Sequence, residues 1–164
     1  MRLAVTIVAC AFLPLASNAD AAPQHRSTMT TSIDALAASA RPAASVVDAF
    51  HAALRRGDTQ AALGFLAKEA LIFEAGGVER GRAEYASHHL AADAAFSQAV
   101  PGIITRRAGE AVGNIAWITG EGRTTGTYKG KAVDRRTVET MVLRRANAGW
   151  KIVHIHWSSA AADK

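Results

Sequence analysis

The chain has 164 residues, of which 49% are hydrophobic and 20% are charged. This length and composition fit one globular domain with a sizeable core and exclude a globally disordered chain. The formal net charge is +5, but the basic residues occur in short pairs, and neighbouring residues of a strand point to opposite faces. Because such pairs build no continuous basic stripe, we expect solvated charges and no nucleic-acid partner.

The N-terminus has the pattern of a secretory signal peptide. A positive start and the apolar run 3–16 precede small residues that permit cleavage after Ala19 or Ala21. The run is too short to span a bilayer comfortably. The only cysteine, Cys10, lies inside the run rather than at its end, which disfavours a lipoprotein. We therefore expect a signal peptide at 1–21, export to the periplasm or beyond, and no membrane partner after cleavage.

The first part of the mature chain predicts a leader and two helices. Residues 22–41 are small and polar, which indicates a flexible leader. From Pro42 onward, apolar residues recur at helical spacing until Gly57, which can end that helix. Asp58 can then cap a second helix at 59–67.

The remaining segments predict a sheet that follows and encloses helices. A strand at 70–77, a short return at 78–81 and a helix from 82 to about 99 precede strand-like segments at 103–113, 114–126, 135–145 and 150–159. Helices first and an antiparallel meander later favour an α+β domain over 42–159, with a tail at 160–164. We expect a curved antiparallel or mixed sheet wrapped on the N-terminal helices, cone-shaped and enclosing a pocket.

The last predicted strand, WKIVHIHWSS, carries two histidines on one face. His154 and His156 are two residues apart, so they can offer two nitrogens to one metal ion, with a third ligand from Glu139 or a helix. No cysteine cluster or His-Glu-x-x-His helix accompanies them, and we expect no metal and no cofactor. The alternative is a pair of hydrogen-bonded histidines in a pocket wall or an interface.

Other titratable side chains are candidates for acid–base chemistry. His88 and His89 point about 100° apart on the predicted helix, and a pocket that desolvates either would make it a proton carrier. Glu74 and Glu139 lie in apolar strands, where burial would raise the pKa of a carboxyl group. The alternatives are partly exposed histidines and rim carboxylates paired with arginine.

The expected pocket wall mixes aromatic, hydroxyl, carboxylate and thioether groups, as suits a ligand of modest polarity. Its candidates are Tyr85, His88, His89, Trp117, Thr119, Glu139, Met141, His154 and His156. The best catalytic candidates among them are His88, His89, Glu139 and His156. The chain has no glycine-rich phosphate loop and no Gly-x-Ser-x-Gly elbow, which disfavours nucleotide binding and serine hydrolysis.

Two stretches carry a family resemblance over roughly 42–159. AFHAALRRGDTQAALGFLAKEALIFEAGG, followed by ERG and a helix, resembles the nuclear transport factor 2-like superfamily and, within it, the SnoaL-like domains. GWKIVHIHWSS is similar to the closing strand of the association domain of calmodulin-dependent protein kinases. The resemblance implies a cone-like α+β barrel with a pocket between helices and sheet, often a dimer through the convex face. It leaves function open, because this scaffold hosts isomerases, dehydratases, cyclases, small-molecule binders and oligomerisation domains.

Departures from these relatives leave two hypotheses. Where the kinase domain has pocket arginines, this chain has Thr119, Met141 and Trp157, and Tyr85 has no evident buried aspartate to complete a steroid-isomerase pair. One hypothesis is an exported protein that binds a small, mainly neutral organic molecule, with isomerase- or lyase-type acid–base activity. The other is a non-catalytic homodimerisation module without a ligand, in which His154, His156 and Trp157 serve the interface.

Overall fold

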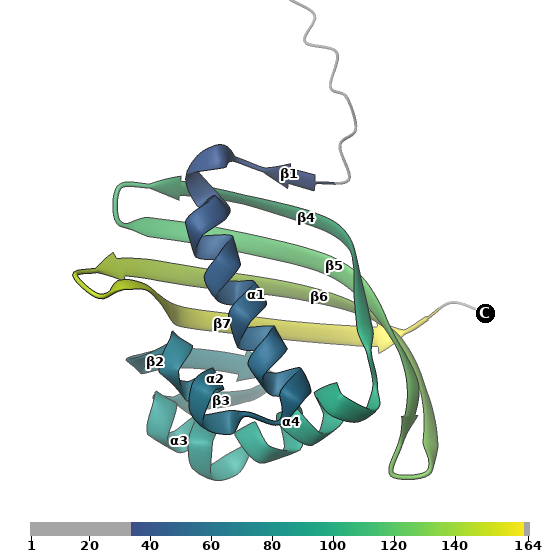
Figure 1. Ribbon diagram of the computed structural model, residues 1–164. Coiled ribbons are helices and arrows are strands. Elements are labelled where there is room, and N and C mark those ends of the chain that lie inside the picture. Colours follow the sequence, from purple (N-terminus) through teal and green to yellow (C-terminus); the bar gives the residue numbers. More distant parts are fainter. Residues whose placement is uncertain (1–33, 163–164) are drawn as a thin grey trace, which may run out of the picture. The chain divides into compact units, whose positions relative to one another are not determined.

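The computed structural model describes residues 34–162, so the expected signal peptide lies outside the described residues (Figure 1). The elements are β1 (Asp34–Leu36), a 3-10 turn (Ala38–Ala40), α1 (Arg41–Arg56), α2 (Thr59–Phe65), β2 (Leu66–Glu74), β3 (Gly77–Arg80), α3 (Arg82–His88), α4 (Leu90–Ala99), β4 (Gly102–Val112), β5 (Ile115–Tyr128), β6 (Lys131–Ala146) and β7 (Gly149–Ala161). No helix of this described part is long and apolar enough to cross a membrane.

The described strands form one mixed sheet in the order β1-β4-β5-β6-β7-β2-β3. The four C-terminal strands make an antiparallel meander, whereas β2 runs parallel to β7 and β1 runs parallel to β4. Helix α1 crosses one face of the curved sheet, and α2, α3 and α4 gather near β2 and β3 (Figure 1). The predicted α+β class with a curved mixed sheet on N-terminal helices is confirmed, and the sheet is not closed into a barrel.

The ordered domain begins earlier than the sequence predicts. Strand β1 lies within the segment expected to be a flexible leader, yet it pairs with β4, and Leu36 packs against the core. Gly109 on β4 permits this contact, because a Cβ there would lie 2.9 Å from Leu36 Cδ1. At the other end, β7 continues to Ala161, two residues beyond the expected boundary. Backbone pairing therefore orders residues whose composition alone indicates flexibility.

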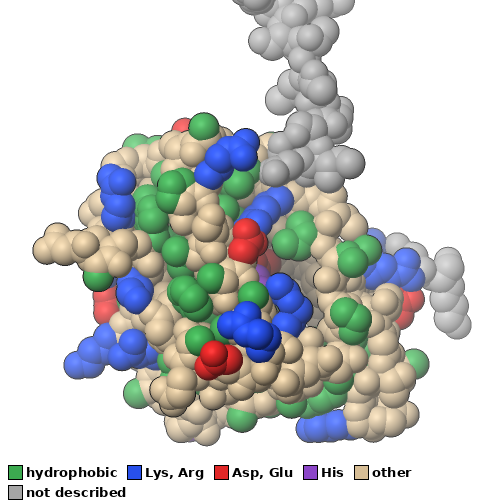
Figure 2. All heavy atoms as spheres, viewed as in Figure 1, with side chains coloured by type: hydrophobic (Ala, Val, Ile, Leu, Met, Phe, Trp, Pro, Cys, Tyr) green, Lys and Arg blue, Asp and Glu red, His purple; other side chains and the backbone are tan. Residues whose placement is uncertain are grey.

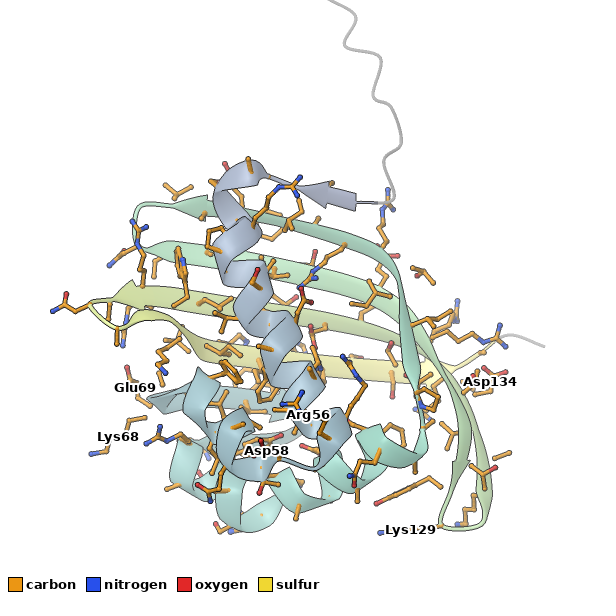
Figure 3. All side chains as sticks on the ribbon, viewed as in Figure 1. Arg56, Asp58, Lys68, Glu69, Lys129 and Asp134 are labelled. Atoms are coloured by element: carbon orange, nitrogen blue, oxygen red, sulfur yellow. The ribbon has the colours of Figure 1, made fainter. Side chains whose placement is uncertain are left out.

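The predicted signals at the α1–α2 junction are confirmed. Gly57 ends α1 in the left-handed conformation, with φ 72°, and its N–H donates to the carbonyls of Ala53 and Leu54. Asp58 caps α2, since its Oδ1 accepts from the N–H of Ala61 at 3.0 Å. Figure 3 shows Asp58 at this junction, where the chain turns from one helix into the next.

The helix expected from 82 to 99 is interrupted at His89. There φ is −113° and ψ is −32°, and the segment divides into α3 and α4. The N–H of His89 still donates to the carbonyl of Tyr85 at 3.1 Å. The predicted single helix is therefore two helices, and both His88 and His89 contact Glu79 on β3.

The core lies between α1 and the inner face of the sheet. Val47, Phe50 and Leu54 from α1 are at most 2% exposed. Their sheet partners include Ile118, Met141, Leu143, Ile152 and Ile155, each at most 1% exposed. Burial of each large apolar side chain contributes roughly 1.5–3 kcal/mol. This layer fixes α1 over the sheet and so sets the position of the polar residues on the flank of the helix.

Candidate functional site

A cavity of about 1010 Å³ opens between α1, α4 and the inner face of the sheet. Its lining includes residues of α1, α4, the β2–β3 turn and strands β4, β5, β6 and β7. Figure 2 shows a hollow on this side of the molecule, with acidic and basic side chains around it and a histidine inside it. This volume can hold a small organic molecule.

Glu139, on β6, forms the fixed polar centre of the cavity. Its Oε2 accepts hydrogen bonds from His51 Nε2 at 2.8 Å and from Trp157 Nε1 at 2.6 Å. The Glu139 side chain is only 16% exposed. Burial raises the pKa of this carboxyl group, but the contacts with His51 and Trp157 and the charge of Arg107 outweigh burial and lower the pKa overall. Glu139 is therefore an ionised acceptor at neutral pH, opposite to the raised pKa that its apolar strand suggests.

Packing fixes both donors to Glu139. The Trp157 ring stacks on Phe50 of α1, with ring centroids 6.2 Å apart and an interplanar angle of 16°. His51 follows Phe50 in α1 and contacts it edge-on at 5.6 Å. Because Phe50 is wholly buried, the same core residue orients the indole and the imidazole.

A second carboxyl group lies where α4 borders the cavity. Asp93 accepts a hydrogen bond from the hydroxyl of the buried Tyr85, with 2.8 Å between Oη and Oδ2. Burial raises the pKa of Asp93 despite the opposing effect of this hydrogen bond. Burial also raises the pKa of the Tyr85 hydroxyl.

Glu74, at the end of β2, joins Asp93 in the cavity lining. It remains accessible to solvent, yet desolvation raises its pKa, and the nearby charge of Asp93 raises it further. A nearby negative charge disfavours ionisation, so Glu74 retains its proton at a higher pH than a free glutamate would. This part of the cavity can take up and release protons, unlike the part around Glu139.

Basic and hydroxyl side chains complete the lining. Arg135 donates from Nε to Ser159 Oγ at 2.9 Å and from Nη2 to the Ser159 carbonyl at 3.1 Å. Lys129 lies over the ring of Tyr128, 5.1 Å from its centroid, at the tip of the β5–β6 hairpin (Figure 3). Tyr128 in turn contacts Phe96 of α4, with 5.2 Å between ring centroids. Arg55 of α1 also lines the cavity. The lining thus combines charges of both signs with apolar surface.

The structure brings only part of the predicted wall to this cavity. Glu139 and His156 border it, although the His156 ring contacts Phe73, with 6.1 Å between centroids. Tyr85 and His89 instead border a separate cavity of about 10 Å³, beside Glu74. His88 borders neither of these two cavities.

The other predicted wall residues lie elsewhere because strand register decides the face. Trp117, Val142 and His154 pair across three strands in one row, and Thr119, Thr140 and His156 form the next row. These rows alternate with the row of Ile118, Met141 and Ile155 and with the row of Gly120, Glu139 and Trp157. Because Met141 and Glu139 face α1 and the cavity, the side chains of the alternating rows lie on the opposite face of the sheet. Met141 shares the inner face with Glu139 but is fully buried in the core.

His154 is held at the outer face by local contacts. Its Nδ1 donates to the carbonyl of Leu71 at 2.9 Å. Its ring meets Phe73 edge-on, with 5.0 Å between centroids. His154 therefore does not join Glu139 and His156 in the cavity lining, and the alternative of a hydrogen-bonded histidine describes it.

Sequence reasoning missed two polar residues of the site. His51 lies three residues after Asp48 and four before Arg55, along one flank of the apolar stripe of α1. This polar flank of the helix could have indicated that His51 faces a cavity. Asp93 is the lone acid in the apolar segment LAADAAF, eight residues after Tyr85. It supplies the aspartate partner that the sequence did not reveal.

The domain is thus an α+β fold in which a polar cavity lies between the helices and a curved sheet. A family model described as a SnoaL-like domain matches residues 43–162. The chain therefore belongs to the SnoaL-like domain family, as its sequence resemblance implies. No match was found among curated proteins.

Solved structures agree with this assignment. A protein from Shewanella frigidimarina, proposed to be a ketosteroid isomerase, is 41% identical, with 71% of this chain and 94% of that chain covered and a TM-score of 0.69. A proposed kinase association domain from Xanthomonas campestris is 22% identical, with coverages of 74% and 87% and a TM-score of 0.64. A proposed dehydratase of the NTF2-like family from Streptomyces avermitilis is 21% identical, with coverages of 76% and 97% and a TM-score of 0.65. The last two share the fold.

Proposed function

We propose that the protein binds a small, mainly neutral organic molecule in the large cavity and catalyses a proton transfer on it, as an isomerase or lyase would. The observation that carries this proposal is that carboxyl groups in one cavity have pKa values shifted in opposite directions. Glu139 has a lowered pKa and stays ionised, whereas Glu74 and Asp93 have raised pKa values. Carboxyl groups whose environments separate their pKa values are suited to different roles on one substrate.

Glu139 suits the role of a fixed anchor. His51 and Trp157 both bond to Oε2, and no bond from a described residue occupies Oε1. That oxygen can accept a hydrogen bond from a hydroxyl or amino group of a ligand. An ionised carboxylate repels an anion, so this anchor favours a neutral donor-bearing ligand over a carboxylate or phosphate.

Glu74 suits the role of the proton carrier, with Asp93 as its modulator. A raised pKa makes a carboxylate a stronger base, and its accessible position lets it reach a bound ligand. Asp93 raises the pKa of Glu74 and is itself held by Tyr85. The resemblance to a relative from Shewanella frigidimarina that is described as a proposed ketosteroid isomerase supports a proton-shifting reaction as the class.

The test combines ligand binding with proton exchange. A panel of neutral carbonyl and hydroxyl compounds is screened by thermal shift, since any ligand of the native state raises the melting temperature. Hits are incubated with the protein in D₂O, and NMR follows loss of their acidic C–H protons. We expect Glu74→Gln to slow this exchange at least about 100-fold. Glu110→Gln, an exposed change on β4 away from the cavity lining, is the matched control and leaves the rate unchanged.

The proposal fails if no compound raises the melting temperature, or if exchange is equally fast in the Glu74→Gln protein. The first result would favour the alternative of a non-catalytic association module without a ligand. A thermal shift without any proton exchange would limit the function to binding.

A separate observation favours self-association through the outer face of the sheet. Large apolar side chains are exposed there: Val112 is 71% exposed, Val138 52%, and Ile115 and Trp117 41% each. The register places Val112, Ile115 and Trp117 on the face opposite to the cavity, whereas Val138 also borders the cavity. Exposed apolar side chains that cluster in this way mark an interaction surface, and a second copy can cover it with the same residues.

We propose a homodimer formed by this outer face, which leaves the cavity open and is compatible with ligand binding. Sedimentation velocity is expected to show a dimer for the natural sequence and a monomer for Trp117→Glu. Ala132→Glu places the same new carboxylate on an exposed position near the β5–β6 hairpin and should stay dimeric. A natural-sequence monomer at micromolar concentration would exclude the dimer.

The N-terminal sequence pattern supports a proposal of export. Residues 1–21 have the charge, apolar run and small residues of a signal peptide. Expression of the full chain in a Gram-negative host, followed by fractionation and intact-mass measurement, is expected to give a periplasmic product cleaved after Ala19 or Ala21. An uncleaved cytoplasmic product would contradict export.

A further inference from the structure

A cluster of carboxylates and imidazoles lies outside the large cavity, between β3 and α3. Glu79 projects from β3, and its side chain is only 7% exposed. Glu84 and His88 lie four residues apart on α3, and the side chains of residues at this spacing lie on one helical face. None of these three residues lines the large cavity, although Glu79 borders the small cavity that Glu74 also borders.

The donor atoms of this cluster converge. One ligand atom from each of Glu79, Glu84 and His88 lies within 4.8 Å of the other two. His88 Nδ1 is 3.3 Å from Glu79 Oε2. Tetrahedral zinc with bonds of about 2.0–2.1 Å separates its ligand atoms by about 3.3–3.4 Å. The buried carboxylate and the imidazole therefore already have the spacing of two zinc ligands, and the more exposed Glu84 can adjust to join them.

The negative charge of the Glu79 carboxylate favours binding of a cation by the cluster. The hydrogen bonds that the described residues make to this buried carboxylate come from the rings of His88 and His89. A buried carboxylate is costly unless a positive charge compensates it. A protonated histidine provides one positive charge, whereas a divalent ion provides two and bonds directly to the carboxylate oxygen.

We propose that Glu79, Glu84 and His88 bind a divalent transition-metal ion, for which Zn²⁺ is best suited, with His89 as a candidate fourth ligand. Mixed imidazole and carboxylate donors suit zinc, cobalt or nickel better than the all-oxygen sites typical of calcium and magnesium. Such an ion ties β3 to α3 next to the break at His89. It stabilises the fold there.

The two histidines singled out from the sequence serve as the internal control. His154 and His156 share the outer sheet face, and the Nδ1 atom of His154 already donates to a backbone carbonyl. They lie on a different strand from the cluster, so replacing both leaves Glu79, Glu84 and His88 intact. Any binding that depends on this pair is therefore distinguishable from binding at the cluster.

The experiment is calorimetric titration of ZnCl₂ into the untagged, chelator-treated protein at pH 7.5. We expect one ion per chain, with His88→Gln and Glu84→Gln each weakening binding at least about tenfold. The His154→Gln/His156→Gln double variant should bind as the natural sequence does. Because Glu84 and His88 are not buried, both single variants are expected to fold, and circular dichroism checks this.

Two further readouts sharpen the result. Zn²⁺ should raise the melting temperature of the natural sequence and raise that of His88→Gln much less. Co²⁺ should give the visible absorption of a four-coordinate site, lost in Glu84→Gln. The proposal is overturned if the natural sequence binds no Zn²⁺ at millimolar concentration. It is also overturned if both single variants bind as well as the natural sequence, or if binding disappears in the double variant.

Discussion

Two carboxyl groups in one cavity, Glu139 and Asp93, have shifted pKa values of opposite sign. Burial raises the pKa of both. Glu139 receives hydrogen bonds from His51 and Trp157 and the charge of Arg107, which together reverse the effect of burial. Asp93 receives a hydrogen bond from the Tyr85 hydroxyl, and this bond does not reverse the effect of burial on its pKa. The number and charge of the donors, rather than depth alone, thus decide which carboxyl group can carry a proton.

The two groups also differ in how the fold holds them. Glu139 lies in the middle of a sheet strand, and its indole donor is stacked on the core residue Phe50. Asp93 lies on the short helix α4, which begins where the helical segment is interrupted at His89. A strand that is buried on its inner face holds a side chain rigidly. A helix end near a turn is held less rigidly, so local structural changes can alter the pKa of a carboxyl group there.

The largest effect should come from removing the anchor. Glu139→Leu leaves the donors of His51 and Trp157 facing an apolar side chain, and unsatisfied donors are costly when partly buried. We expect the free energy of unfolding to fall by about 2 kcal/mol. Urea denaturation at pH 7 measures it. Glu139→Gln keeps an oxygen acceptor and should cost about half as much; equal losses in both variants would refute this role for the acceptor.

The pH dependence of the free energy of unfolding should reveal the ionisation of Glu139. Because the folded-state pKa of Glu139 is lowered, its stabilising contribution is full above the ordinary glutamate pKa and disappears as pH falls through the folded value. The stability advantage of the natural sequence over Glu139→Gln should therefore shrink between pH 6 and pH 3. Urea denaturation at intervals across this range tests it, and a constant difference would contradict the lowered pKa.

Trp157→Phe should have a smaller effect. Phenylalanine keeps an aromatic ring to stack on Phe50 but removes the indole N–H that bonds to Glu139. We expect a loss of about 1 kcal/mol, the net contribution of a typical hydrogen bond. NMR titration of the Glu139 side chain should also show a higher pKa than in the natural sequence. A stability loss with no change in that pKa would assign Trp157 to packing alone.

Much of the fold could be predicted from the sequence because its signals are local. Gly57 and Asp58 mark the junction of two helices by their own backbone and side-chain preferences. Gly113 and Gly130 have positive φ in the turns of two later hairpins, which is a local preference of the same kind. Strand β1 could not be predicted, because its three residues are ordered by pairing with β4, about 70 positions away. The break at His89 likewise has no proline or glycine to announce it.

The site was less predictable, because a one-residue change in register exchanges the faces of a strand. A register shift between Val142 and Leu143, where β6 meets β7, accompanies the placement of His154 on the outer face. Glu139 borders the cavity, yet its partners come from α1 and β7, which sequence spacing does not connect. The direction of its pKa shift depends on those partners and so could not be inferred from the strand alone.

The smallest expected effect, and the only gain in stability, concerns Asp93. Its folded-state pKa is raised, so the ionised group costs stability above the ordinary aspartate pKa, and the cost disappears as pH falls below that value. Asp93→Asn keeps an oxygen that accepts from Tyr85 but carries no charge. We expect it to raise the free energy of unfolding at pH 8 by roughly 0.5–1 kcal/mol, with the difference vanishing near pH 4.

Asp48→Asn is the matched comparison for this last variant, because it makes the same chemical change at a carboxylate with a cationic partner. Asp48 Oδ1 lies 2.7 Å from Arg107 Nη1, and its side chain is 58% exposed. Removing its charge weakens an ion pair rather than relieving a burial cost, so it should leave stability unchanged or lower it at pH 8. If both asparagine variants lose stability at pH 8, Asp93 is a structural acceptor that prefers its charge, and the contrast between the two parts of the cavity is lost.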